Sequence, residues 1–138
     1  MTPLQRNRVS EILDTFADGF VGHHGDCIGA DGEFHALCLA NRHVRWIEIH
    51  PPTEGARRAY CERGWVEAVI HPPAPYLERN EDIAIAGKDA LIATPKEQGR
   101  EVVRSGTWST IRRARALGRA IAIVWPNGTV FATGRHGG

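Results

Sequence analysis

The chain has 138 residues, of which 24% are charged and 42% hydrophobic, and its formal net charge at pH 7 is +1. This length suits one compact domain with a hydrophobic core and is too short for two, so we expect a single domain over residues 1–138. The near-neutral charge does not call for nucleic acid or an anionic membrane as a partner. No apolar run is long enough to span a bilayer, and the first residues form no signal core, so we expect a cytoplasmic protein without membrane contact.

The cysteines and histidines of the chain are its most obvious potential metal ligands. The cysteines Cys27, Cys38 and Cys61 are odd in number and form no CxxC pair, which argues against disulfides and against a thiolate zinc site. His23, His24, His50 and His71 each end a strand-like segment and could gather at one sheet edge. Because no tight spacing such as HxxxH accompanies them, the sequence predicts no metal and no cofactor.

The first half of the chain alternates helical and strand-like segments. Thr2 is a good N-cap and Pro3 a good first helical residue, and the apolar positions after them share one helix face until Gly19 ends the segment. The patterns then predict, in order, a strand at 20–23, a helix at 31–40, a strand at 44–49, a short helix at 56–62 and a brief strand-like run or connector at 66–70.

The second half continues the alternation. It predicts a helix at 76–86 ended by Gly87, a strand at 90–94, a polar loop at 95–105, a helix that begins near Gly106 and runs through Leu117, and a strand at 120–125. Asn127-Gly128 then separates this strand from another at 129–132, which favours an antiparallel β-hairpin before a loose tail. Strands that alternate with helices imply an α/β fold with a parallel sheet.

Two turns that contain glycine begin helices. Gly25 and Gly29 lie in the first turn, which follows the strand at 20–23, and Gly106 lies in the second. Such turns let a backbone approach a ligand, and the unpaired N–H groups and dipole of the following helix attract phosphate. Parallel strands place such turns along one edge, so both could address one ligand. The alternative is that the first turn needs glycine for its geometry alone.

Three segments together resemble the SLOG superfamily of Rossmann-like nucleotide-binding domains: Gly25-Asp26-Cys27-Ile28-Gly29-Ala30-Asp31, Tyr76-Leu77-Glu78-Arg79-Asn80 and Arg104-Ser105-Gly106-Thr107-Trp108-Ser109-Thr110. That superfamily includes the Lonely Guy phosphoribohydrolases and the Rossmann domain of the DNA-processing protein A. The resemblance spans most of the chain. It implies a Rossmann-like three-layer sandwich with a mostly parallel sheet, to which this chain adds the C-terminal hairpin.

The resemblance also implies a site for a nucleotide or a nucleotide-like small molecule. Arg79 falls where the phosphoribohydrolases carry a functional arginine, and Arg79 and Asp31 are the candidate catalytic residues. The candidate ligand-binding residues are Gly25, Asp26, Gly29, Ala30, Asp31, Arg79, Asn80, Arg104, Ser105, Gly106, Thr107 and Thr110. An acidic residue at a helix start can also serve only as a cap that complements the helix dipole, and this alternative stays open for both aspartates.

Two departures from the family pattern weaken parts of this reading. Of the phosphoribohydrolase loop only Gly106 and Thr107 survive, and Thr110 stands at the position of the catalytic glutamate, which argues against N-glycosidic hydrolysis. By the resemblance, the central strand of a 3-2-1-4-5 sheet would precede Met1, so the domain should lack the family's first strand. The segment 130–137 resembles that strand and could return to the centre, although Asn127-Gly128 favours a plain hairpin.

The sequence thus leaves three functions in order of preference. The first is a nucleotide-binding sensor or carrier module, and the second is a phosphoribohydrolase that uses Arg79 for the phosphate and Asp31 or Glu101 as the acid. The third is a DNA-binding accessory protein that uses the arginines of the helix at 107–117 and Arg119, although helical arginines are more often a solvated face. We also expect a homodimer, because an edge strand and the apolar side of that helix would otherwise be exposed.

Overall fold

A computed structural model describes residues 1–61, 64–86, 90–103 and 105–133. Along the chain these residues form α1 (Pro3–Asp14), β1 (Phe20–His24), α2 (Ala30–Leu39), β2 (Val44–Ile49), the 3-10 turn η1 (Gly55–Arg57), β3 (Ala68–Ile70), α3 (Tyr76–Ala86), β4 (Leu91–Ala93), α4 (Gly106–Ala116), β5 (Ile121–Val124) and β6 (Val130–Thr133). The predicted loose tail, Gly87 and Arg104 lie outside the described residues. The short helix predicted at 56–62 is confirmed only as the single turn η1.

The first helix begins as the sequence predicts. The Thr2 hydroxyl accepts a hydrogen bond from the Gln5 backbone N–H, and the Gln5 side chain accepts one from the Thr2 N–H. This reciprocal capping box satisfies two donors at the helix start, and Pro3 occupies the first helical position.

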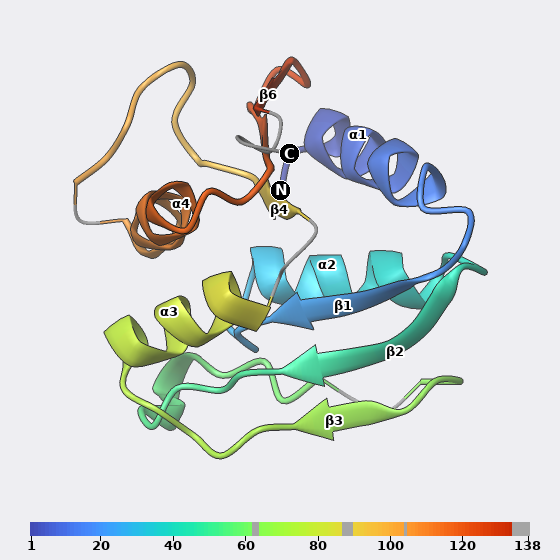
Figure 1. Cartoon of the computed structure of the whole chain (residues 1–138), viewed down its shortest axis with the longest axis vertical. Coiled ribbons are helices and arrows are strands. Elements are labelled where there is room, and N and C mark those ends of the chain that lie inside the picture. The colour runs from blue at the N-terminus through green and yellow to red at the C-terminus, as the bar shows by residue number, and fades with distance from the viewer. Residues whose placement is uncertain (62–63, 87–89, 104, 134–138) are drawn as a thin grey trace.

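The described strands form two small sheets instead of one. β1, β2 and β3 are parallel neighbours in that order, and β4 pairs with β5 in parallel while β6 pairs with β5 antiparallel. Figure 1 shows the first sheet apart from β4 and β6. The α/β class is therefore confirmed, but the single sheet expected from the sequence is interrupted, because no described strand lies between β1 and β4.

The C-terminal hairpin is confirmed. The Gly128 N–H donates to the Trp125 carbonyl, and the Trp125 N–H donates to the Thr129 carbonyl. The connection is thus a three-residue loop, Pro126 to Gly128, in which Gly128 has a φ of 85°. The register pairs Val124 with Val130 and Ile121 with Thr133, so this described part of the segment pairs with β5 and does not return to the centre.

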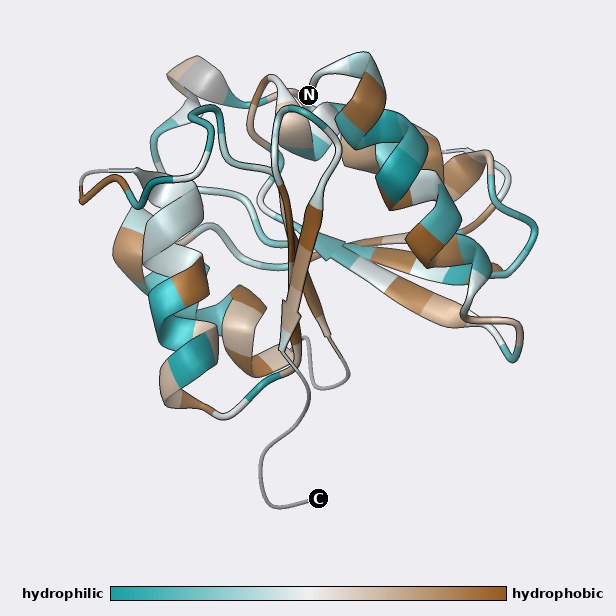
Figure 2. Cartoon of the chain, turned by 90° about the horizontal axis from the view of Figure 1, so that it is seen from above, coloured by the Kyte–Doolittle hydropathy of each residue, from teal (hydrophilic) through white to brown (hydrophobic). Residues whose placement is uncertain are grey.

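The helices divide between the two sheets. α2 packs on β1 and β2, α4 packs on β4 and β5, and α3 lies against α4 and reaches β1. The strands at the centre of Figure 2 are mainly apolar, whereas the helices carry both apolar and polar residues. One buried cluster is centred on Ile47 and Ile49 and the other on Trp108 and Ile111. Trp108 and Ile111 belong to α4, so its apolar side is covered within the chain, which removes one of the two reasons for expecting a dimer.

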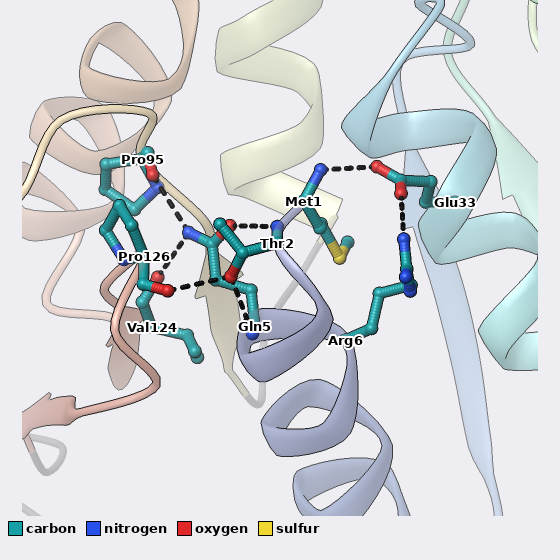
Figure 3. A network of polar contacts seen from close by, with 8 residues as sticks. All are labelled: Met1, Thr2, Gln5, Arg6, Glu33, Pro95, Val124 and Pro126. Atoms are coloured by element: carbon teal, nitrogen blue, oxygen red, sulfur yellow. Dashed lines mark hydrogen bonds and ion pairs between the residues drawn. The ribbon is translucent and has the colours of Figure 1, made fainter.

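The start of α1 ties the two sheets together (Figure 3). The buried Gln5 amide donates to the carbonyls of Pro95 and Val124, which follow β4 and end β5. The amino group of Met1 pairs with Glu33 on α2, which covers the first sheet. The start of α1 therefore links the two sheets, whose described strands do not pair with each other. None of the described helices is long and apolar enough to cross a membrane.

Candidate functional site

A cavity of about 1410 Å³ lies between the two sheets. Its lining includes β1 from the first sheet and β4 from the second, together with the residues that begin α2 and α4. The carboxyl ends of parallel strands and the amino ends of the helices after them are where α/β proteins bind ligands. The two glycine-containing turns, nearly eighty residues apart in the sequence, thus border one space.

The first turn is held from behind by Arg79. Arg79 is 5% exposed, and its guanidinium donates to the Gly25 carbonyl, the Cys27 thiol sulfur and the Asn80 side-chain oxygen. A Cβ atom on Gly25 would stand 2.0 Å from Nη1 of this guanidinium, so only glycine leaves room for the arginine. Arg79 therefore fixes the turn as well as lining the cavity.

Asp26 serves the turn and not the cavity. Its backbone φ is 56°, and its buried carboxylate accepts hydrogen bonds from Arg58 and from the Cys61 N–H, each at 3.0 Å. Burial alone would raise the pKa of this carboxyl, but the hydrogen bonds from Cys61 and Arg58 outweigh it and hold the pKa below its usual value. Asp26 consequently anchors the loop after β2 to the first turn.

Asp31 lies in the first turn of α2 and does line the cavity. Its carboxylate accepts a hydrogen bond of 3.0 Å from the Cys27 N–H, while burial raises its pKa above the usual value. The N-cap residue Gly29 has a φ of 105° and makes no side-chain cap, and no atom lies near where its Cβ would be. Asp31 thus closes the turn and offers a carboxyl that protonates more easily than usual.

The second turn begins α4. The Ser105 hydroxyl accepts from the Trp108 N–H at 3.4 Å, and the Thr110 hydroxyl donates to the Gly106 carbonyl at 3.1 Å. The positions in front of this helix are open, because no atom lies within 4 Å of where a Gly106 Cβ would be. Unpaired N–H groups at such an open helix start suit an anionic group.

Most of the predicted site residues come together. The cavity lining contains Ala30, Asp31, Arg79, Asn80, Ser105, Gly106, Thr107 and Thr110. Gly25, Asp26 and Gly29 support the first turn without lining the cavity, and Arg104 lies outside the described residues. The lining also includes apolar side chains that the site prediction omitted, among them Phe34, Ile92 and Trp108.

His24 and His35 form a buried pair beneath the first turn. The His24 Nδ1 accepts from the Asp26 N–H at 3.0 Å, so its Nε2 carries the proton and donates to His35 Nδ1 at 2.9 Å. Burial lowers the pKa of His24 to about 3, with a further decrease from the neighbouring His35. His35 was not predicted as a site residue, because it lies within a helix and no local motif marks it.

A second histidine group lies at the carboxyl ends of β1, β2 and β3. His23 Nδ1 lies 3.1 Å from His50 Nε2, the His50 and His71 rings stack at 4.2 Å, and His71 Nε2 lies 2.7 Å from Glu48 Oε1. Of the four strand-end histidines that could gather, His23, His50 and His71 do so and His24 pairs with His35 instead, while Glu48 joins the group unpredicted. Burial lowers the pKa of His50 to about 4 and also lowers that of His23.

The arginines on and after α4 make contacts within the chain. Arg112 pairs with Glu101 at 2.9 Å, Arg115 lies over the Trp108 ring, and Arg119 donates to the carbonyls of Ala84 and Ile85. The ion pair with Glu101 neutralises part of the positive charge that binding to DNA would need.

Comparisons of the chain with models of protein families, with curated proteins and with solved structures find no match.

Proposed function

We propose that this chain binds a nucleotide or a similar phosphate-bearing small molecule in the cavity between the two helix starts, as a sensor or carrier module. The observation that carries this proposal is that the beginnings of α2 and α4 and the side chain of Arg79 line one cavity. Helix N-termini attract anions through their free N–H groups and their dipoles.

The cavity offers contacts for both parts of such a ligand. Arg79 and Lys96 bring positive charge to its wall, which suits a phosphate group. Phe34 and Ile92 supply apolar surface, which suits a base or another flat ring. The parallel order of β1, β2 and β3 with α2 on one side agrees with a Rossmann-like layering of the nucleotide-binding type, which we propose as the finer description of the fold.

A thermal-shift screen tests the proposal. AMP, ADP-ribose, NAD and cyclic nucleotides are added to the wild type and to Gly106→Asp, which places a carboxylate at the open start of α4. A ligand at a hundredfold its dissociation constant adds about 2.7 kcal/mol to stability, which the melting temperature reports. At least one compound should stabilise the wild type and the exposed control Thr53→Asp, but not Gly106→Asp. Silence across the panel, or equal shifts in all three proteins, would contradict the proposal.

A second candidate function is hydrolysis of the N-glycosidic bond of a nucleoside monophosphate. Asp31 favours it, because this carboxyl lines the cavity and its pKa is raised by burial, as a general acid requires. Free base should then be released from nucleoside monophosphates by the wild type and by Asp82→Asn, an exposed control, and not by Asp31→Asn or Arg79→Ala. A module that only binds would show no turnover in any of them.

A further inference from the structure

The parallel register of the first sheet brings three potential ligands together. His23 on β1 is the register partner of Glu48 on β2, so the two side chains leave the sheet at the same level. His50 follows Glu48 by two residues, and residues two apart in an extended segment point to the same face of the sheet. Strand pairing, and not sequence spacing, therefore assembles this group at the carboxyl edge of the sheet.

The distances within the group suit a single metal ion. One ligand atom from each of His23, Glu48 and His50 lies within 4.8 Å of the other two, and the two imidazole nitrogens are 3.1 Å apart. A zinc ion about 2.0–2.1 Å from two nitrogens in tetrahedral geometry holds them roughly 3.3 Å apart. An ion could therefore take the place of the hydrogen-bonded proton at nearly the same separation of the two nitrogens, once the rings turn so that both lone pairs point at it.

The charge and orientation of the three groups also suit a cation. His23 Nδ1 and His50 Nε2 face each other across one hydrogen bond, and imidazole nitrogens are ligands that zinc prefers in proteins. The carboxylate of Glu48 is oriented from two sides, by Trp46 Nε1 at 3.0 Å and by His71 Nε2 at 2.7 Å. The negative charge of Glu48 offsets the positive charge of Arg79, whose field reaches His50.

We propose that His23, Glu48 and His50 form a binding site for one divalent transition-metal ion of the zinc type. His23 and Glu48 both line the cavity, so an ion held by this group would lie at its wall. This inference goes beyond the proposed nucleotide binding and does not depend on it, because the site is defined by the metal alone.

Another group of possible ligands, His24, His35 and Cys61, serves as the internal comparison. Both nitrogens of His24 already make hydrogen bonds, to the Asp26 N–H and to His35. Burial, a hydrogen bond and the nearby charge of Asp26 raise the pKa of the Cys61 thiol to about 12, which disfavours the thiolate that a metal requires. We therefore place the ion at the first group.

Calorimetric titration of Zn²⁺ into tag-free, chelator-treated protein tests the proposal. The wild type should bind one ion per chain. His23→Gln and Glu48→Gln, which keep hydrogen-bonding groups at half-buried positions, should each weaken binding by at least about tenfold, since even loss of an outer contact to a metal ligand costs 10- to 100-fold. His43→Gln, which lies before β2, and Cys61→Ser should bind as the wild type does. Circular dichroism confirms that each variant is folded.

Co²⁺ absorption distinguishes the two groups directly. Binding at His23, Glu48 and His50 should give visible bands without the near-ultraviolet charge-transfer band of a thiolate ligand. The proposal is overturned if folded His23→Gln or Glu48→Gln binds Zn²⁺ as tightly as the wild type. It is equally overturned if the wild type does not bind Zn²⁺, or if Cys61→Ser abolishes binding together with a thiolate band.

Discussion

Replacing Gln5 by methionine should weaken the link between α1 and the second sheet and so lower the free energy of unfolding. Methionine has a similar length but cannot donate to the carbonyls of Pro95 and Val124, nor accept from the Thr2 N–H, at distances of 2.9, 2.9 and 2.8 Å. Because Gln5 is 2% exposed, water has little access to the groups that lose their partner.

The expected cost follows from these three bonds. Each contributes about 0.5–1.5 kcal/mol net, and a buried group left without a partner costs about 1–3 kcal/mol. Some relaxation around methionine recovers part of this, so we expect the free energy of unfolding to fall by about 3 kcal/mol. That is a large share of the roughly 5–15 kcal/mol by which domains are stable. Gln5→Glu should cost still more at pH 7, because a carboxylate would face the same two carbonyls and cannot donate to them.

Urea unfolding followed by circular dichroism and by tryptophan fluorescence measures these changes. The matched control is Gln98→Met, because Gln98 is exposed and its side chain accepts one hydrogen bond from the Asn127 N–H. The control should stay within about 0.5 kcal/mol of the wild type. A loss below about 0.5 kcal/mol for Gln5→Met, or a carboxylate at this position that is better tolerated than methionine, would refute the assigned role of this side chain.

Three further predictions concern packing, pH and assembly. Gly25→Ala should lower the free energy of unfolding in urea by about 1–3 kcal/mol, because its Cβ would overlap the buried guanidinium of Arg79. Gly106→Ala has open space around the new Cβ and should change this free energy by less than about 0.5 kcal/mol. Equal effects of the two substitutions would contradict this prediction. The pKa of His24 is lowered to about 3 and that of His50 to about 4, so below their ordinary value of 6.5 the unfolded chain binds protons that the folded chain does not. Stability should therefore be steady above pH 7 and decline toward pH 5 by up to about 1.4 kcal/mol per pH unit for each histidine, and an unchanged urea midpoint at pH 5 would count against it. Light scattering should give twice the 15.2 kDa chain mass. Phe131→Lys, at a residue of the edge strand β6 that is 54% exposed, should reduce this to the mass of a monomer, and a wild type that stays monomeric on concentration would disprove the dimer.

Local chemistry made much of the chain predictable. Thr2 and Pro3 specify a helix start without help from the rest of the fold, and Asn127-Gly128 specifies a chain reversal in the same way. The strand ends that carry His23 and His50 were also recognisable, because each strand runs into a turn or proline-rich segment. These features depend on a few neighbouring residues, which the sequence shows directly.

Features that depend on distant partners were not predictable in the same way. That His23 would meet Glu48 depends on the register between β1 and β2 and on the irregularity near Phe20, which no local pattern reveals. Asp26 resembles a ligand contact in the sequence, but its carboxylate is used by Arg58, 32 residues later. The division of the strands into two sheets likewise depends on which strands pair across the whole chain.

That division has a consequence for how the backbone of β1 exchanges its amide hydrogens. The Phe20 N–H and the His24 carbonyl bond to the segment that contains β2, so alternate residues of β1 face that strand and Val21 and His23 face the other way. No described strand covers that second edge. Deuterium uptake along β1 should therefore alternate residue by residue, slow at Gly22 and His24 and fast at Val21 and His23. The slow amides are those that bond to β2, and the fast ones lie on the edge of β1 that pairs with no described strand.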